Sequence, residues 1–266
     1  MAEEIVASSW GELAELLFEG AWSEPLRRFR SPYAFRGNSD ARHHLETSLS
    51  RLGPSAPTIE AHLLRNFRKY AFGTIPGDDS TWSWLALAQH HGLPTRLLDF
   101  SFSPFVALHF ATARLDFFDR AGVVWMINYV ETNRLLPDAL REVLADEGSD
   151  VFTAEMLSRV APSLDGFGAL ARQPFVAFLD PPSLDARIVN QAALFSIMSS
   201  ARAHFFAWLQ QHPRTYRKIV IPAGLKWEVR DKLDQGNVTE RVLFPGLDGL
   251  SAWLRRYYTE RPGDPG

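Results

Sequence analysis

The densest group of polar side chains in an otherwise apolar stretch lies between Gln89 and Asp99. Its eleven residues include a glutamine, two histidines, a threonine, an arginine and an aspartate. Arginine offers a fork of donors, aspartate a pair of acceptors, and histidine a group that titrates near neutral pH. The segment joins two predicted helices, and such connections commonly carry binding groups. It therefore predicts a binding site, with a structural pair between Arg96 and Asp99 as the alternative.

An earlier arginine is the second candidate. Tyr33–Arg36 is a short run that is mostly apolar and ends at Gly37, so it predicts a strand leading into a turn. An arginine at such a junction is suited to hold an anionic ligand through charge-assisted hydrogen bonds. The alternative is that Arg36 anchors a carboxylate of the core.

Several segments resemble the FRG domain family, which is defined largely by sequence. They are Phe35-Arg36-Gly37, the stretch Gln89–Ser101 with Ser103-Pro104 and Ala107–Ala111, Arg187–Gln191 with Phe195, and Leu243–Leu250. This signature region extends over about residues 30–255. The resemblance implies one FRG domain over residues 1–260, and we expect the Pro/Gly-containing tail at 261–266 to be disordered.

Three motifs in order also resemble mono-ADP-ribosyltransferases of the Arg-Ser-Glu type. They are Phe35-Arg36-Gly37, Ser101-Phe102-Ser103 ahead of Ala107–Ala111, and Glu240 ahead of the apolar run that ends at Pro245. This resemblance implies NAD as the substrate and no metal, with Glu240 and Arg36 as catalytic residues. The residues expected to bind NAD are Arg36, Gly37, Gln89, His90, His91, Thr95, Arg96, Ser101 and Ser103.

The resemblance also implies a role for each group. Arg36 would hold the diphosphate or its ribose, and Ser101 or Ser103 would support the nicotinamide ribose. Glu240 would hold a ribose hydroxyl and stabilise the oxocarbenium-like charge as nicotinamide leaves. The alternatives are a helix cap for Ser103 and a strand-edge position for Glu240.

Two departures from the transferase pattern concern Glu240. Arg241 stands between this glutamate and the apolar strand residues, so Glu240 would face the other side of the strand unless a bulge restores the register. Val238 occupies the position where arginine-directed transferases have a second acidic or amide residue. Arginine-directed transfer is therefore not implied.

The function that these resemblances imply is NAD-dependent ADP-ribosyl transfer or NAD hydrolysis, in a bacterial toxin or phage-defence effector. A protein or nucleic-acid acceptor and an antitoxin or other regulator would be its partners. The alternative is a non-catalytic ligand-sensing or protein-interaction module that retains the fold and the Arg36 pocket. Nucleic-acid binding as the main function is disfavoured by the net charge of −3.

The elements that must position these groups follow from periodicity and caps. Helices are predicted over Trp10–Glu19, Glu60–Phe72, Trp82–His91, from Ser103-Pro104 onward, over Pro137–Asp146 and over Leu247–Tyr258. Strands are predicted at Tyr33–Arg36, Gly122–Val130, Phe175–Leu179, Leu194–Met198, Lys218–Ile221 and Arg241–Phe244. Gly148–Gly168 is predicted to be a surface insertion.

These elements do not alternate regularly, which argues against a doubly wound fold. We expect a single α/β (α+β) domain with a split, bent mixed sheet flanked by helices. The transferase resemblance implies an ADP-ribosyltransferase-like form of this fold. The pocket would lie between Arg36, the Gln89–Ser103 segment and Glu240.

Composition sets the remaining limits. The chain has 266 residues, of which 46% are apolar, and no cysteine, so disulfides and thiolate metal sites are excluded. His90 and His91 would point about 100° apart on a helix and are not expected to share a metal. No apolar run approaches the ~20 residues of a membrane span, and no signal peptide is evident. We expect a cytoplasmic protein without a membrane partner.

Overall fold

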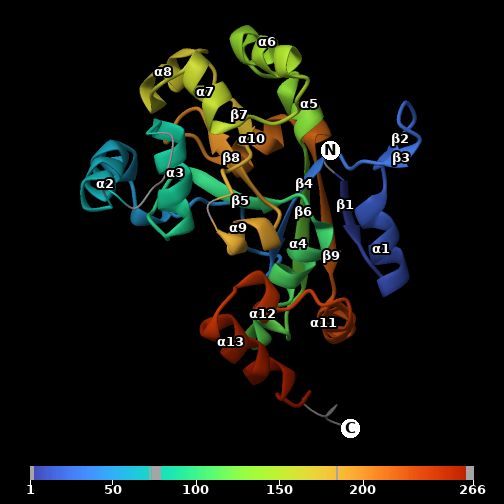
Figure 1. Cartoon of the computed structure of the whole chain (residues 1–266). Helices are drawn as coiled ribbons and strands as arrows, with labels where there is room; N and C mark the ends of the chain where they lie inside the picture. The colour runs from blue at the N-terminus through green and yellow to red at the C-terminus, as the bar shows by residue number, and fades with distance from the viewer. Residues whose placement is uncertain (1–2, 72, 74–78, 184, 262–266) are drawn as a thin grey trace.

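The centre of the molecule is a seven-stranded mixed sheet (Figure 1). In this computed structural model the described residues are 3–71, 73, 79–183 and 185–261. The sheet strands are β1 (Glu3–Val6), β4 (Tyr33–Asn38), β5 (Leu97–Ser101), β6 (Gly122–Asn128), β7 (Val176–Leu179), β8 (Ala193–Met198) and β9 (Tyr216–Ile221). They are ordered β1-β9-β6-β4-β5-β8-β7, with β1 parallel to β9 and every other neighbour antiparallel. A separate hairpin pairs β2 (Trp22–Ser23) with β3 (Arg28–Phe29).

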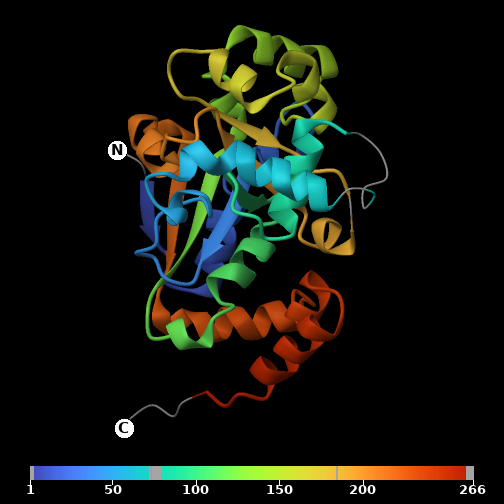
Figure 2. The ribbon, with the colours of Figure 1, turned by 90° about the vertical axis from the view of Figure 1, so that its left-hand side faces the viewer.

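Helices pack on the sheet from several sides (Figures 1 and 2). They are α1 (Trp10–Phe18), α2 (Ala56–Tyr70), α3 (Thr81–His90), α4 (Pro104–Ala111), α5 (Tyr129–Asn133), α6 (Asp138–Glu147), α7 (Ala154–Val160), α8 (Leu164–Ala169), α9 (Ala186–Asn190), α10 (Phe205–Gln211), α11 (Lys226–Gln235), α12 (Glu240–Leu243) and α13 (Leu247–Tyr257). The expected mixed α/β class with a mixed sheet and flanking helices is therefore confirmed.

Helix starts follow the caps that the sequence predicts. Ser9 accepts a hydrogen bond from the backbone of Glu12 and caps α1. Ser103 does the same for the backbone N–H of Val106, and Pro104 occupies the first position of α4. Serine at the cap and proline just inside it satisfy or remove donors that have no partner in the helix. The predicted capping role of Ser103 is confirmed.

Alternating side chains along the strands divide the core between the two faces of the sheet. In β6, Val123, Trp125 and Ile127 face a cluster that runs across the sheet from β9 to β7 and includes α10. On the opposite face the apolar side chains form two separate clusters. One joins α1, α4 and α11 to β4, β6 and β9. The other joins α2, α3, α6, α7 and α8 to β5, β7 and β8.

The sheet parts where these two clusters meet. β4 is paired with β6 through six residues, but with β5 only through Phe35 and Ser101. In a continuous antiparallel register Gly37 would lie opposite Asp99. The ladder stops before that position, so the two strands diverge toward the end of β4 that carries Arg36 and Gly37.

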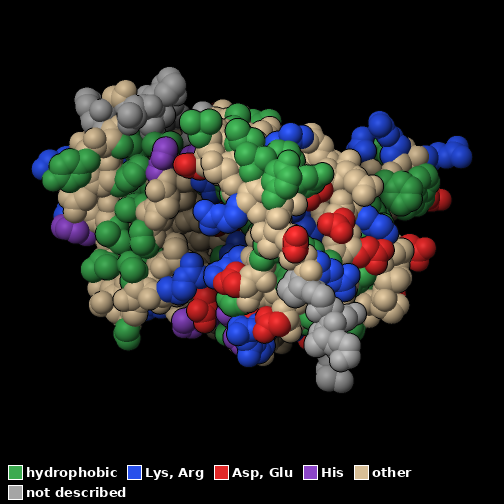
Figure 3. Space-filling model, turned by 90° about the horizontal axis from the view of Figure 1, so that it is seen from below, with side chains coloured by type: hydrophobic (Ala, Val, Ile, Leu, Met, Phe, Trp, Pro, Cys, Tyr) green, Lys and Arg blue, Asp and Glu red, His purple; other side chains and the backbone are tan. Residues whose placement is uncertain are grey.

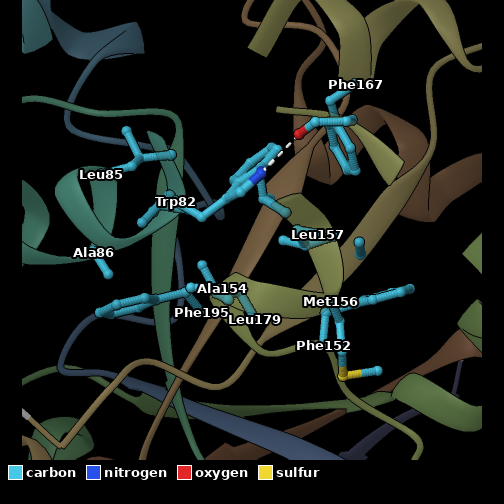
Figure 4. Close-up of a cluster of buried hydrophobic side chains, with 14 of the residues drawn as sticks. Trp82, Leu85, Ala86, Phe152, Ala154, Met156, Leu157, Phe167, Leu179 and Phe195 are labelled. Atoms are coloured by element: carbon cyan, nitrogen blue, oxygen red, sulfur yellow. Dashed lines mark hydrogen bonds between the residues drawn. The ribbon is translucent and has the colours of Figure 1, made fainter. Parts of the chain in front are cut away.

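The predicted surface insertion at Gly148–Gly168 is wrong. Helices α7 and α8 lie in this segment, and it contributes Phe152, Met156, Leu157 and Phe167 to the core beside α3. Trp82 of α3 contacts Phe167 edge to face and donates from Nε1 to the carbonyl of Ala161 at 2.8 Å (Figure 4). The two helices were not recognised in the sequence, because each buries only one side and polar residues interrupt its apolar positions.

The predicted strand at Arg241–Phe244 is also wrong, because these residues form most of the helical turn α12 and its end. Glu240 and Leu243 are the buried residues of α12, and their spacing of three places both on one side of a helix. Phe244 leaves the helix immediately before Pro245, as the residue before a proline usually does. The expected end of the second helix at Phe72 and the expected disordered tail, apart from Arg261, lie outside the described residues.

Candidate functional site

A cavity of about 190 Å³ lies where β4 and β5 diverge, between the two apolar clusters. The residues that line it come from β4, β5, β8, α3, α4 and α9, including the end of α9. The lining residues are Phe35, Arg36, Gly37, His90, Asp99, Phe100, Ser101, Val106, Ala107, Phe110, Arg187, Ile188, Gln191, Ala193 and Phe195. Apolar rings and a few polar groups make up this wall, a composition typical of small-molecule sites.

Arg36 occupies the gap in the sheet. Its Nη1 donates to the backbone carbonyl of Asp99 at 2.5 Å, so the side chain pairs with an acceptor on the diverging strand. The Arg36 side chain as a whole remains 22% exposed, while its Nε is buried without a hydrogen-bond partner among the described residues. Burial lowers the pKa of Arg36, the carboxylate of Asp99 raises it, and Arg51 lowers it further. An arginine in this setting stays charged, so the cavity wall carries a positive group.

Asp99 brings a carboxylate to the same wall. Its Oδ2 lies 3.9 Å from Arg36 Nη1, and its side chain is 59% exposed. Gln89 donates from Nε2 to that oxygen at 3.0 Å, and Gln89 Oε1 accepts from the hydroxyl of Thr95 at 2.6 Å. Thr95 therefore holds Gln89, and Gln89 holds the Asp99 carboxylate, although neither Thr95 nor Gln89 lines the cavity.

The predicted structural pair between Arg96 and Asp99 is wrong. Arg96 instead pairs with Glu60 of α2, and both side chains are buried. Arg96 Nε lies 2.9 Å from each oxygen of Glu60, and Nη1 donates to the carbonyl of Ser199 at 3.1 Å. This pair anchors the start of β5, so Arg96 has a structural position rather than one in the cavity.

Helix α9 closes one side of the cavity and is held at both ends. His90 Nε2 lies 2.5 Å from Oδ2 of Asp185, the residue that caps α9. At the other end, Gln191 donates to the carbonyl of Leu243, and its own carbonyl accepts from the hydroxyl of Ser101 at 2.7 Å. Arg187, between these anchors, adds a second guanidinium to the lining and lies over the ring of Phe244.

Four of the predicted ligand-binding residues line the cavity: Arg36, Gly37, His90 and Ser101. Among the other five, Gln89 and Thr95 lie behind Asp99, Arg96 is buried against Glu60, and Ser103 caps α4. His91 is the exposed cap residue at the end of α3.

Glu240 does not line this cavity. Arg256 of α13 donates to both of its oxygens, from Nε at 2.6 Å and from Nη2 at 2.8 Å. Burial raises the pKa of Glu240, but the hydrogen bonds from Arg256 outweigh it and hold the pKa below the usual value. The glutamate is thus an ionised, paired group that joins α12 to α13. Its catalytic role stays a prediction that this arrangement does not favour.

The ion-pair network around Glu240 continues to a buried histidine of α4. Asp234 binds Arg256 and Arg230, and the fully buried Arg230 donates from Nη1 to His109 Nδ1 at 2.9 Å. Since a guanidinium only donates, His109 Nδ1 accepts and the imidazole is neutral. Burial, followed by the positive charge of Arg230, lowers the pKa of His109 to about 3.

This histidine predicts a loss of stability in mild acid. The pKa of His109 is lowered from about 6.5 in the unfolded chain to about 3 in the fold. Between these values the unfolded chain binds the extra proton, so the free energy of unfolding falls as the pH drops below 6.5. From pH 6.5 to pH 5 this group alone is expected to remove about 2 kcal/mol.

Urea unfolding at pH 7 and pH 5 measures this effect, with His109→Gln as the comparison because glutamine keeps an acceptor and does not titrate. The wild type is expected to lose more stability than the variant between the two pH values. An equal loss in both proteins would show that His109 does not titrate as its burial requires.

Further observations on the described residues limit the chemistry. No group of three or more His, Cys, Asp or Glu side chains among them is arranged to hold a metal ion. None of the described helices combines the length and apolar composition that crossing a bilayer requires.

Seen from below, the surface is hollowed left of centre, and Lys and Arg side chains stand on the rim of the hollow (Figure 3).

The sequence did not reveal several residues that line the cavity or hold its lining residues in place. Asp99 was interpreted as a structural residue, and the partners Glu60 and Asp185 were not considered. Glu60 had a detectable signal, since it lies four residues before Leu64 on the inward face of α2. Asp185 could be found only from the fold, because 94 residues separate it from His90 along the chain.

The fold and site define a mixed α/β protein with an arginine and a carboxylate at a split in its sheet. Residues 31–120 match the family model described as the FRG domain. The match includes Phe35-Arg36-Gly37 and the whole Gln89–Asp99 segment, whereas the later resembling segments lie beyond it. No curated protein matches the chain significantly, and neither does any solved structure.

Proposed function

We propose that the chain binds NAD at the Arg36 cavity and cleaves the bond between nicotinamide and ribose. The observation that carries the proposal is the placement of the Arg36 guanidinium and the Asp99 carboxylate 3.9 Å apart on one cavity wall. A cation suits the diphosphate of a dinucleotide, and a carboxylate suits the positive charge that develops on the ribose. The aromatic side chains of Phe35, Phe100, Phe110 and Phe195 offer an apolar setting for a flat ring.

In this proposal the carboxylate that stabilises the oxocarbenium-like charge is Asp99 rather than Glu240. The glycosidic C–N bond breaks with its electron pair leaving on nicotinamide, and an acceptor adds to the ribose carbon and loses a proton. Water as the acceptor gives hydrolysis, and a group on a protein or nucleic acid gives ADP-ribosyl transfer. Gln89 would hold Asp99 in position, and Arg187 would add a second cation for the diphosphate.

The biological setting that we propose is a bacterial toxin or phage-defence effector that acts in the cytoplasm and is restrained by an antitoxin or regulator. This setting rests on the family resemblance of the sequence alone. The ADP-ribosyltransferase-like form of the fold belongs to the same proposal.

Nicotinamide release from NAD tests this function. Asp99→Asn keeps the shape of the side chain and is expected to lower kcat by about 10²–10³, the effect of removing one preorganised electrostatic group. Arg36→Lys keeps the charge but loses the fork of donors, so KM for NAD is expected to rise about tenfold. Glu240→Gln is the control, expected to lower the melting temperature while leaving kcat and KM unchanged.

Several outcomes would contradict the proposal. If turnover survives both cavity substitutions, the cavity is not the active site. If turnover is lost only in Glu240→Gln protein that still folds, Glu240 is the catalytic carboxylate after all. If the wild type shows no turnover of NAD and NAD does not change its melting temperature, NAD is not the ligand.

A non-catalytic sensing module is the second candidate. The observation that favours it is the neutralisation of Glu240 by Arg256 outside the cavity, which leaves the transferase pattern without its expected carboxylate. In that case NAD or another nucleotide raises the melting temperature of the wild type, this increase is lost in Arg36→Lys, and no nicotinamide is released.

A further inference from the structure

The hairpin of β2 and β3 exposes apolar side chains far from the cavity. Trp22 and Phe29 contact each other edge to face, yet they are 49% and 60% exposed, and Leu26 at the tip is 60% exposed. The hairpin projects from the body of the molecule beside α1 (Figure 1). Two strands of two residues have little stability of their own in water. Large exposed apolar groups gathered in one place mark an interaction surface.

An open groove of about 990 Å³ lies directly beside the hairpin. It is lined by Glu12, Ala14, Glu15, Leu16, Phe18, Glu19 and Phe29. All but the last belong to α1 or directly follow it, so the groove runs along this helix and ends at the hairpin. Four of these lining residues are apolar and three are glutamates.

The charges on the two parts are opposite. Arg27, Arg28 and Arg30 are exposed on the hairpin, and no ion pair involves any of them among the described residues. In the groove, Glu19 forms an ion pair with Arg217 at 2.9 Å. The exposed Glu15 forms no ion pair with any other described residue. From below, basic side chains stand out at the right-hand end of the molecule, with apolar and acidic ones beside them (Figure 3).

From this we propose that two copies of the chain associate through this surface, with the hairpin tip of each copy seated in the α1 groove of the other. A surface that carries both an apolar basic projection and an apolar acidic groove is complementary to itself. When two such surfaces meet about a two-fold axis, each contact occurs twice and the assembly closes as a dimer. Leu26 would contact the apolar side chains that line the groove, and Arg27 and Arg28 would meet Glu15. The proposal is independent of the proposed function, since the cavity lies on other elements.

Sedimentation velocity over a concentration series tests the association. The wild type is expected to form a dimer whose dissociation constant rises with salt, because opposite charges meet at its rim. Leu26→Asp places a charge at the tip, so the dissociation constant is expected to rise about tenfold or more. Leu247→Asp is the matched control, a similarly exposed leucine on α13, and is expected to leave the dimer intact.

A charge exchange tests which groups meet. Glu15→Arg alone and the pair Arg27→Glu with Arg28→Glu are each expected to weaken the dimer. All three changes in one chain are expected to restore it. A dimer that tolerates Leu26→Asp, or a failure of the combined variant to recover, would overturn the proposed contact.

The absence of native cysteine gives a direct second measurement. A Glu15→Cys chain mixed with a tagged Arg27→Cys chain is expected to form a disulfide-linked heterodimer on oxidation, identified by the size of the tag. A wild type that stays monomeric throughout the series, with no mixed disulfide, would overturn the proposal and leave the surface to a different protein.

Discussion

Gly37→Ala is expected to lower the free energy of unfolding by at least about 3 kcal/mol or to prevent folding, the upper end of the cost of overpacking. A Cβ at this position would lie 1.8 Å from the carbonyl oxygen of Ala107 and 2.7 Å from the backbone nitrogen of Ala111. Both atoms belong to the backbone at α4, so no side-chain rotation relieves the clash. Because α4 also walls the cavity, a variant that folds is expected to lose ligand binding.

Gly224→Ala is the matched control. A Cβ there meets nothing within 4 Å, and the residue has no left-handed backbone conformation. Urea unfolding of both variants separates the close approach from the general effect of replacing glycine. Equal stability of Gly37→Ala and wild type would mean that β4 and α4 lie farther apart than described here.

The buried pair of Arg96 and Glu60 predicts the second large effect. Arg96→Met or Glu60→Gln is expected to cost about 3–5 kcal/mol, because each leaves the remaining group buried without its proper partner. Replacing both, as Arg96→Met with Glu60→Leu, is expected to recover most of that loss, since two apolar groups carry no desolvation penalty. Denaturant unfolding of the two single variants and the double variant gives the coupling between the residues.

An exposed pair of the same kind provides the comparison. Arg134 Nη1 lies 2.9 Å from Glu131, and the arginine is largely in solvent. Arg134→Met is expected to cost no more than about 1 kcal/mol. If Arg96→Met were as mild, the pair would contribute little to holding the start of β5, and the support of the cavity would have to come from elsewhere.

The periodic and capped elements were predictable from local sequence. Ser103-Pro104 predicts the start of α4. The apolar run at Gly122–Val130 contains β6, although its last two residues begin α5. The run at Arg241–Phe244 was misassigned, because a few apolar residues are compatible with a strand or with one helical turn. Whether a partner strand is available decides between them, and local sequence does not contain that information.

The site was predictable as a set of segments but not as a geometry. The motifs correctly indicated that Arg36 and part of the Gln89–Asp99 segment lie together. They did not reveal which arginine is buried, because Arg96 and Arg36 differ only in what the rest of the fold brings to them. The fold places Glu60 of α2 beside Arg96 and the backbone carbonyl of Asp99 beside Arg36.

The sequence alone determined the mixed class of the fold, about half of the helices and strands, the segment that matches the FRG family model and the residues from which a site can be built. Those properties depend on side-chain type and on spacing within one element. Only the tertiary structure decided that the split in the sheet lies between β4 and β5, that Asp99 faces the cavity and that Glu240 is bound by Arg256. These outcomes depend on contacts between residues distant in the chain, where burial and charge pairing are settled by packing.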